Sequence, residues 1–210
     1  FAGFDAQLII MDVVPWMLPY YEASGIQFEI EDNRDYMDYT FTPEQFLAGM
    51  DTQDDRYRYN YFKRRFAYET EEITPFHREE IREFMEREWC GEKICEECHC
   101  GCLLRVIDNL VPVFDKIRIN GILVRVEGKM AGLCIVSCRN GLGVYQYKNA
   151  VNRIKGINEY LLRESFERYL QSADTINYTE DMGVENLRYY KEHMAPAHTL
   201  LSKLTLTERG

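Results

Sequence analysis

Two adjacent carboxylates, Glu180 and Asp181, directly follow a short segment with the composition of a β-strand. Carboxylates at such a place could hold an incoming ammonium group or accept its proton, which acyl transfer to an amine requires. The same acids could instead cap the next predicted helix, 184–193, and interact with the positive end of its dipole. Both interpretations stay open from these residues alone.

A second group of residues is basic and surrounds a predicted helix start at Gly156. Lys148, Arg153 and Lys155 precede this glycine. Acids, not cations, are favoured at helix N-termini, so three cations there favour an anionic ligand. Arg153-x-x-Gly156 partly matches the pyrophosphate loop of acetyltransferases, in which backbone N–H groups and the helix dipole bind phosphate. We expect phosphate binding here; a solvated basic turn is the alternative.

The helix after the carboxylates carries Arg188 and Lys191, which share one face because they lie three residues apart. They could hold a phosphate or a carboxylate. We expect this of Arg188, whereas Lys191 fits better in a surface salt-bridge face. The sequence has no Gly-x-Ser-x-Gly elbow, which suits direct attack by the acceptor without an enzyme nucleophile.

Residues 56–65 place five cations among Tyr57, Tyr59, Tyr61 and Phe62. Basic and aromatic residues interleaved in this way suit RNA phosphates and base stacking. The alternating tyrosines could equally be one face of a strand or pack against a helix. The net charge of −10 favours the packing interpretation.

Five cysteines and a histidine crowd into residues 90–102: Cys90, Cys95, Cys98, His99, Cys100 and Cys102. These residue types could bind zinc, although a zinc ribbon needs two well-separated cysteine pairs. A reduced cysteine-rich loop is the alternative, and we assign no metal ligands.

The composition, 46% hydrophobic and 29% charged over 210 residues, is that of a folded globular protein. A pI near 5.0 argues against a generally basic surface that coats nucleic acid. No apolar run approaches the roughly 20 residues of a membrane span, and no signal peptide is evident, so we expect a cytoplasmic protein. The sequence opens at Phe1 directly before a strand, and we expect a fragment that lacks part of its first fold unit.

The predicted elements before residue 117 alternate between strands and helices. Thr74-Pro75 caps an amphipathic helix with Phe76, Ile81, Phe84, Met85 and Trp89 on one side. A helix over 103–116 must bend or end at Pro112. The remaining elements are strands 7–14, 26–30 and 66–73 and helices 15–23 and 42–48.

From residue 117 the order is three antiparallel strands, then helix, strand, helix and strand. This is the second half of an acetyltransferase-type (GNAT) fold. The strand–helix–strand in its middle should be a right-handed crossover between parallel strands, with ligands beyond their carboxyl ends. The predicted ranges are 117–126, 130–138, 143–148, 156–171, 175–178, 184–193 and 199–207.

Residues 176–191 resemble the hallmark motif of the phosphatidylglycerol lysyltransferase C-terminal-domain-like family. The positions that match are Asn177, Glu180, Asp181, Gly183, Glu185, Leu187, Arg188 and Lys191, whereas Tyr178, Thr179 and Asn186 depart from it. Weaker resemblances lie at Lys148 with Gly156, where Tyr147 replaces a Glu, and at 58–66. Residues 34–39 are similar to the family's R-D-x-x-D-Y.

The resemblance implies an α/β (α+β) protein with a GNAT-like mixed sheet flanked by helices. It implies tandem acetyltransferase-like units, 1–70 as the remainder of the first and 71–210 as the second. The implied function is transfer of an acyl or aminoacyl group to an amine or hydroxyl of a small molecule or lipid headgroup. The donor would be an aminoacyl-tRNA or acyl-CoA held by Lys148, Arg153, Lys155, Gly156 and Arg188, with no further cofactor required. Glu180 and Asp181 would act on the acceptor. A non-catalytic GNAT-like ligand-binding module is the alternative.

Overall fold

The computed structural model describes residues 8–90, 103–194 and 199–208. By their contacts the residues group into two compact units. Unit 1 combines residues 1–41 with 177–210, and unit 2 consists of residues 42–176. The predicted boundary near residue 70 concerns tandem ancestral units, which a grouping by contacts does not test, so it stays a prediction.

Unit 2 is built on a mixed sheet. Its strands follow the order β4-β5-β6-β7-β8, and the first four are antiparallel neighbours. The central strands are the core because their side chains are buried on both faces, among them Ile122, Leu133 and Ile135 at 0% exposure. The bounds are β4 (Tyr68–Glu72), β5 (Ile119–Val126), β6 (Lys129–Arg139), β7 (Leu142–Ala150) and β8 (Thr175–Asn177, its last residue in unit 1).

The strands β7 and β8 begin side by side. The carbonyl of Gly141, just before β7, accepts hydrogen bonds from the amides of Asp174 and Thr175 at the start of β8. The two strands therefore run parallel, as predicted for a strand–helix–strand crossover. A register shift against β6 leaves Gln146 as an extra residue in β7, which is a β-bulge.

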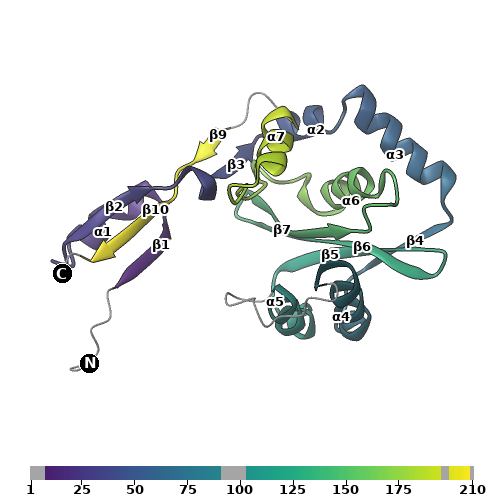
Figure 1. Cartoon of the computed structure of the whole chain (residues 1–210), viewed down its shortest axis with the longest axis horizontal. Helices are drawn as coiled ribbons and strands as arrows, with labels where there is room; N and C mark the ends of the chain where they lie inside the picture. Colours follow the sequence, from purple (N-terminus) through teal and green to yellow (C-terminus); the bar gives the residue numbers. More distant parts are fainter. Residues whose placement is uncertain (1–7, 91–102, 195–198, 209–210) are drawn as a thin grey trace. The chain divides into compact units, whose positions relative to one another are not determined.

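Helices cover both faces of this sheet: α3 and α6 lie on one side and α4 and α5 on the other (Figure 1). The α-helices are α2 (Pro43–Gly49), α3 (Gln53–Arg65), α4 (Arg78–Met85), α5 (Leu103–Leu110) and α6 (Ile157–Ser165). Short 3-10 or π turns extend them at Pro75–His77, Glu86–Cys90, Val111–Val113 and Phe166–Leu170.

Local sequence signals explain most of these helices. Thr42 and Gln45 form a reciprocal capping box at the start of α2. Pro112 ends the regular part of α5, as predicted. In α4, Ile81, Phe84 and Met85 are fully buried, but the predicted inward position of Phe76 is wrong, because its side chain is 96% exposed before the regular helix begins.

The basic and aromatic segment is helix α3, so the tyrosines are not one face of a strand. Tyr57 and Tyr61, four residues apart, lie together at 6.1 Å between ring centroids. Tyr59 and the buried Phe62 pack instead on Tyr160 of α6. The packing interpretation is therefore confirmed for Tyr59 and Phe62.

Unit 1 contains a small antiparallel sheet of order β1-β10-β2, formed by β1 (Ile9–Val13), β10 (Leu204–Glu208) and β2 (Phe28–Asp32). Its small core of Val13, Leu204 and Leu206 is partly covered by α1 (Leu18–Glu22), which follows a 3-10 turn at Pro15–Met17. The alternation of apolar and polar residues over 26–30 predicts a half-buried strand, and this is wrong, since four of the five β2 residues are exposed.

The rest of unit 1 pairs β3 (Asp38–Phe41) antiparallel with β9 (Thr199–Leu201) and adds helix α7 (Glu185–Met194). A 3-10 turn, Arg34–Tyr36, precedes β3. The single strand predicted over 199–207 is wrong. It divides at Ser202–Lys203 because β9 pairs with β3, whereas β10 pairs with β1 and β2.

The cysteine-rich segment, residues 90–102, lies outside the described part of the chain, except for the backbone of Cys90. Within the described residues, no group of histidine, cysteine and acidic side chains has a metal-binding arrangement. Over the same residues, none of the helices has the length and apolar character needed to cross a bilayer.

Candidate functional site

Two family motifs, residues 34–39 and residues 176–191, lie far apart in the sequence. They meet in unit 1 around the carboxylate of Asp181. This side chain is fully buried. It accepts two hydrogen bonds of 2.9 Å from the guanidinium of Arg188, one of 3.1 Å from Arg34 and one of 2.7 Å from the hydroxyl of Tyr39. The first motif thus supplies Arg34 and Tyr39, and the second supplies the acid and Arg188.

These contacts decide the protonation of Asp181. Burial by itself would raise its pKa, but hydrogen bonds from Arg188, Tyr39 and the amide of Gly183 hold the pKa well below the ordinary range. A carboxylate stabilised in this way is a weak base at neutral pH. Asp181 is therefore charged at neutral pH and suited to fix its neighbours.

Arg188 has a second partner, since its Nη2 atom lies 2.5 Å from a carboxylate oxygen of Asp35. The chain approaches closely here: a Cβ atom at Gly183, where φ is +72°, would lie 2.9 Å from the Asp35 carboxylate. Glycine is thus favoured by its conformation, and any larger residue would also displace the Asp35 side chain. The Nε and Nη2 atoms of Arg188 are therefore both bound within unit 1.

Lys191 of α7 is buried, with 3% of its surface exposed, so its assignment to a surface salt-bridge face is wrong. Its ammonium group donates to the main-chain carbonyls of Tyr178 at 2.5 Å, Glu180 at 2.7 Å and Thr179 at 3.2 Å. No pattern in the sequence indicates this contact, because it depends on the path of the preceding loop. That loop has left-handed backbone at Thr179, with φ of +57°.

Glu180 differs from its neighbour Asp181. Its side chain is 27% exposed, and its carboxylate lies 3.5 Å from the ammonium group of Lys203. Lys203 also contacts Asp38 at 2.8 Å and Asp12 at 3.8 Å. Partial burial opposes the charge, but Asp38, Glu180 and Asp12 together raise the pKa of Lys203. No motif marks Lys203 in the sequence, and only the break between β9 and β10 places it here.

Of the three acids around Lys203, which are Asp12, Asp38 and Glu180, Asp38 is the one held by a further hydrogen bond. The amide of Asn177 donates to it at 2.8 Å, and both residues are buried. The structure therefore brings together the motif positions Asn177, Glu180 and Asp181 with Arg34, Asp35, Asp38 and Tyr39 from the earlier motif.

The predicted basic group lies in unit 2, where β7 leads into α6. Gly156 is the N-cap residue of α6, with φ of +88° and no side-chain cap. A Cβ atom at this position would lie 2.1 Å from the carbonyl oxygen of Arg58 in α3. This glycine is therefore required by close packing, whether or not a phosphate binds.

The three predicted cations differ in their surroundings. The Lys148 ammonium donates to Asn158 in the first turn of α6 at 2.7 Å, and burial lowers its pKa. Arg153 is 77% exposed and lies 3.6 Å from Glu88. Lys155 is exposed, with its ammonium 4.6 Å from the ring centre of Tyr57. Arg153 and Lys155 are the cations that face solvent.

Helix α3 continues this basic surface within unit 2. It packs beside α6, with Arg58 3.8 Å from Glu159, and Lys155 lies over both Tyr57 and Tyr61. Its exposed cations are Arg56, Arg58, Lys63, Arg64 and Arg65. Of these, Arg56 and Arg58 are paired with Asp51 and Asp54.

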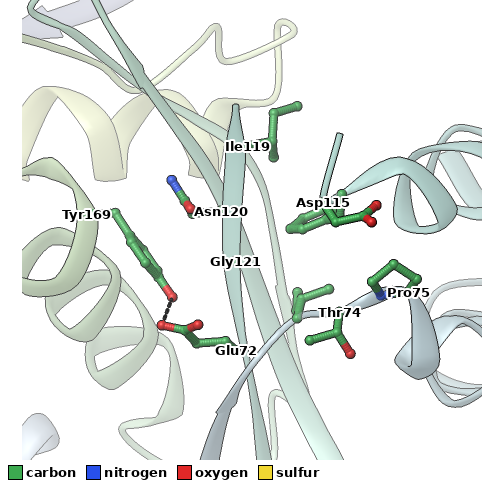
Figure 2. A pocket seen from close by; sticks show the side chains of 10 residues that line it. Glu72, Thr74, Pro75, Asp115, Ile119, Asn120, Gly121 and Tyr169 are labelled. Carbon is green, nitrogen blue, oxygen red and sulfur yellow. Dashed lines mark hydrogen bonds between the residues drawn. The ribbon is translucent and has the colours of Figure 1, made fainter. Parts of the chain in front are cut away.

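A shallow pocket of about 150 Å³ lies elsewhere in unit 2, between the ends of β4 and β5 (Figure 2). Tyr169 and Glu72 line one side and are joined by a hydrogen bond of 3.2 Å, and Asp115 lies on the other. Burial and the Glu72 carboxylate raise the pKa of Tyr169 to about 12. Ile119, at its edge, pairs with Ser137, and Ser137 pairs with Val144 in the first half of β7. The pocket therefore belongs to the end of the sheet opposite the basic loop, and no predicted site residue lines it.

Solved structures with this fold define the class to which the chain belongs. A conserved protein of unknown function from Bacteroides thetaiotaomicron VPI-5482 aligns with a TM-score of 0.78 at 24% identity, over 97% of this chain and 70% of that one. L-PGS from Bacillus licheniformis aligns with a TM-score of 0.67 at 14% identity, over 97% and 69%. A tandem GNAT protein from the clavulanic acid biosynthesis pathway aligns with a TM-score of 0.55 at 10% identity, over 96% and 62%. The fold is GNAT-like, as predicted.

The family follows from the sequence itself. The family profile described as phosphatidylglycerol lysyltransferase, C-terminal, matches residues 1–202, and the chain belongs to this family. The resemblance based on the motifs is thereby confirmed. No curated protein sequence matches the chain. The chain thus belongs to a family of acyl and aminoacyl transferases, and its donor and acceptor stay open.

Proposed function

We propose that this chain transfers an aminoacyl or acyl group from a phosphate-bearing donor to an amine or hydroxyl acceptor. The observation that carries the proposal is the uncapped start of α6 at Gly156, flanked by the exposed cations Arg153 and Lys155. Such a helix start attracts anions through its backbone N–H groups and its dipole. Lys148, bound to the first turn of α6, would complete the donor-binding group.

Among donors, an aminoacyl-tRNA fits better than an acyl-CoA. The cations of α3 adjoin the Gly156 turn and lie interleaved with tyrosines, a combination suited to a long polyanion. A coenzyme A would need only the few phosphate contacts of the turn itself. The acceptor would be a small molecule or a lipid headgroup with a free amine or hydroxyl.

In the proposed reaction, the acceptor nitrogen or oxygen attacks the acyl carbon of the donor. The bond from that carbon to the donor oxygen, or to sulfur in a thioester, breaks, and the departing group takes up a proton. Glu180 would receive the proton of the acceptor, because its carboxylate is partly exposed. Asp181 and Arg188, which bind each other, would keep the acceptor side in place rather than exchange protons.

A non-catalytic module that binds the same ligand is the second candidate. It is favoured by the mutual pairing of Asp181 and Arg188, which leaves these charges satisfied without any substrate. The two candidates predict the same donor binding and differ in turnover.

Binding of the purified chain to bulk tRNA charged with radiolabelled amino acids, and separately to acetyl-CoA, tests the donor site. The double variant R153A/K155A should weaken tRNA binding about 10-fold and flatten its salt dependence, because two phosphate contacts are lost. The double variant K116A/R139A, at exposed cations near the opposite end of the sheet, is the matched control. Equal affinity of both double variants would contradict the donor site.

Transfer of the label to phosphatidylglycerol vesicles, or to a soluble amine, tests the reaction. E180Q should lower turnover by about 100-fold or more with little change in tRNA affinity. Donor binding without transfer to any acceptor would favour the non-catalytic module.

A further inference from the structure

One side chain of the following helix, Lys191, binds the backbone of the loop that carries Glu180. The ammonium group of Lys191 donates to three successive carbonyls, those of Tyr178, Thr179 and Glu180. A lysine ammonium is compact and has three donors, so it matches three oxygens that converge on one point. The loop backbone is thereby fixed on both sides of the residue whose carboxylate is partly exposed.

This loop would not keep its shape by local preference. Thr179 and Met182 have φ angles of +57° and +53°, in the left-handed region that side chains other than glycine, asparagine and aspartate rarely adopt. Such residues persist only where the surroundings impose their conformation. The buried ammonium of Lys191 supplies part of those surroundings, together with the backbone of Tyr39, which pairs with Tyr178 and Thr179, and the Asp181 side chain, which accepts from the Gly183 amide at 3.0 Å.

We propose that Lys191 is a positioning residue: by binding the carbonyls of residues 178–180 it sets the place of the Glu180 carboxylate. Glu180 itself has only Lys203 beside it, at 3.5 Å, among the ion pairs of the described residues. Its side chain would therefore follow the backbone when the loop moves. A displacement of about 1 Å can lower a catalysed rate about 100-fold. The contacts of Lys191 with these three carbonyls are called the clamp below. This inference rests on the proposed function, because it assigns the purpose of the clamp to proton transfer at Glu180.

The first test measures the clamp without any reaction. Hydrogen exchange of the amides of Tyr178, Thr179 and Gly183, each hydrogen-bonded in the structure, should be faster in K191M than in the unchanged protein. K129M, a change of the same type at an exposed lysine, should leave them unchanged. K191Q, which keeps amide donors, should show a smaller increase than K191M. Unaltered exchange in folded K191M, or in K191A where K191M does not fold, would overturn the proposal.

The second test asks whether the clamp acts through Glu180. K191M should lower kcat about 100-fold and leave the KM for charged tRNA nearly unchanged, since the donor group belongs to other residues. In an E180Q background the same change should cost less than about 3-fold, because the two losses share one cause. If the kcat loss of the double variant equals the product of the two single losses, Lys191 acts independently of Glu180, and the inference is wrong. If the unchanged protein binds donors but transfers nothing, the proposed function fails, and the exchange experiment alone judges the clamp.

Discussion

Arg34 and Asp181 stand 147 positions apart in the sequence and are joined by a hydrogen bond of 3.1 Å within unit 1. Each belongs to one of the two family motifs, and Tyr39 and Arg188 bind the same carboxylate. The motifs are therefore two halves of one ion-pair network. Their residue types are explained to a large extent by what they do for each other, whereas the partly exposed carboxylate of Glu180 lies next to this network and pairs with Lys203.

Removing the charge at the centre of this network should destabilise the fold. In D181N the guanidinium groups of Arg34 and Arg188 lose their shared partner, and we expect a loss of about 2–4 kcal/mol, reduced because both are about one-third exposed. D35N removes an exposed partner of the same Arg188 and should cost about 1 kcal/mol or less. Urea unfolding of the two variants is the measurement. Equal stability of D181N and D35N would show that the buried carboxylate is not the centre.

The same carboxylate should contribute to acid unfolding. The pKa of Asp181 is depressed in the folded state, so its stabilisation is present above the unfolded-state pKa of about 3.9 and is lost as pH falls through the folded value. The unfolding free energy of the unchanged protein should therefore drop more steeply below about pH 4 than that of D181N. Chemical unfolding at a series of acidic pH values compares the slopes, and parallel curves would refute the assignment.

The sequence predicted elements and motifs better than it predicted contacts. Periodicity located Ile81, Phe84 and Met85 correctly on the buried side of α4, and Pro112 marked the end of α5. Phe76 was assigned to the same stripe because periodicity cannot tell where the regular helix begins. The pattern therefore gives the face of a helix more securely than its first turn.

The predicted site was incomplete for a similar reason. Lys191 looks like a surface cation in a one-dimensional pattern, because nothing in the sequence reveals that three carbonyls converge on it. Lys203 belongs to no motif, and its contact with Asp38 arises only when β9 pairs with β3. Residues that act through main-chain geometry or strand pairing cannot be identified from residue types alone.

The lowered pKa of Lys148 predicts how its replacement changes the stability of the fold with pH. Burial lowers its pKa, so the folded protein disfavours the charged form, and stability is gained as pH rises from the folded value towards the ordinary lysine pKa of about 10.4. K148M should thus be as stable as the unchanged protein near neutral pH, or more so, and lose that advantage in alkali. Thermal unfolding across this range checks the trend, with K129M as the exposed control. An advantage that grows with pH would contradict it.

Gly156 and Gly128 form a matched pair for testing why a glycine begins α6. Both have positive φ angles, +88° and +75°, but a Cβ atom at Gly128 would meet nothing within 4 Å, whereas at Gly156 it would lie 2.1 Å from the carbonyl oxygen of Arg58. G128A should therefore cost only the left-handed strain, about 1–2 kcal/mol. G156A adds an overlap with rigid backbone, so α3 and α6 must separate, and we expect a loss of about 3 kcal/mol or more. Urea midpoints and unfolding slopes decide between these values. A similar loss in the two variants would mean that α3 yields easily, and the glycine would then be explained by its conformation alone.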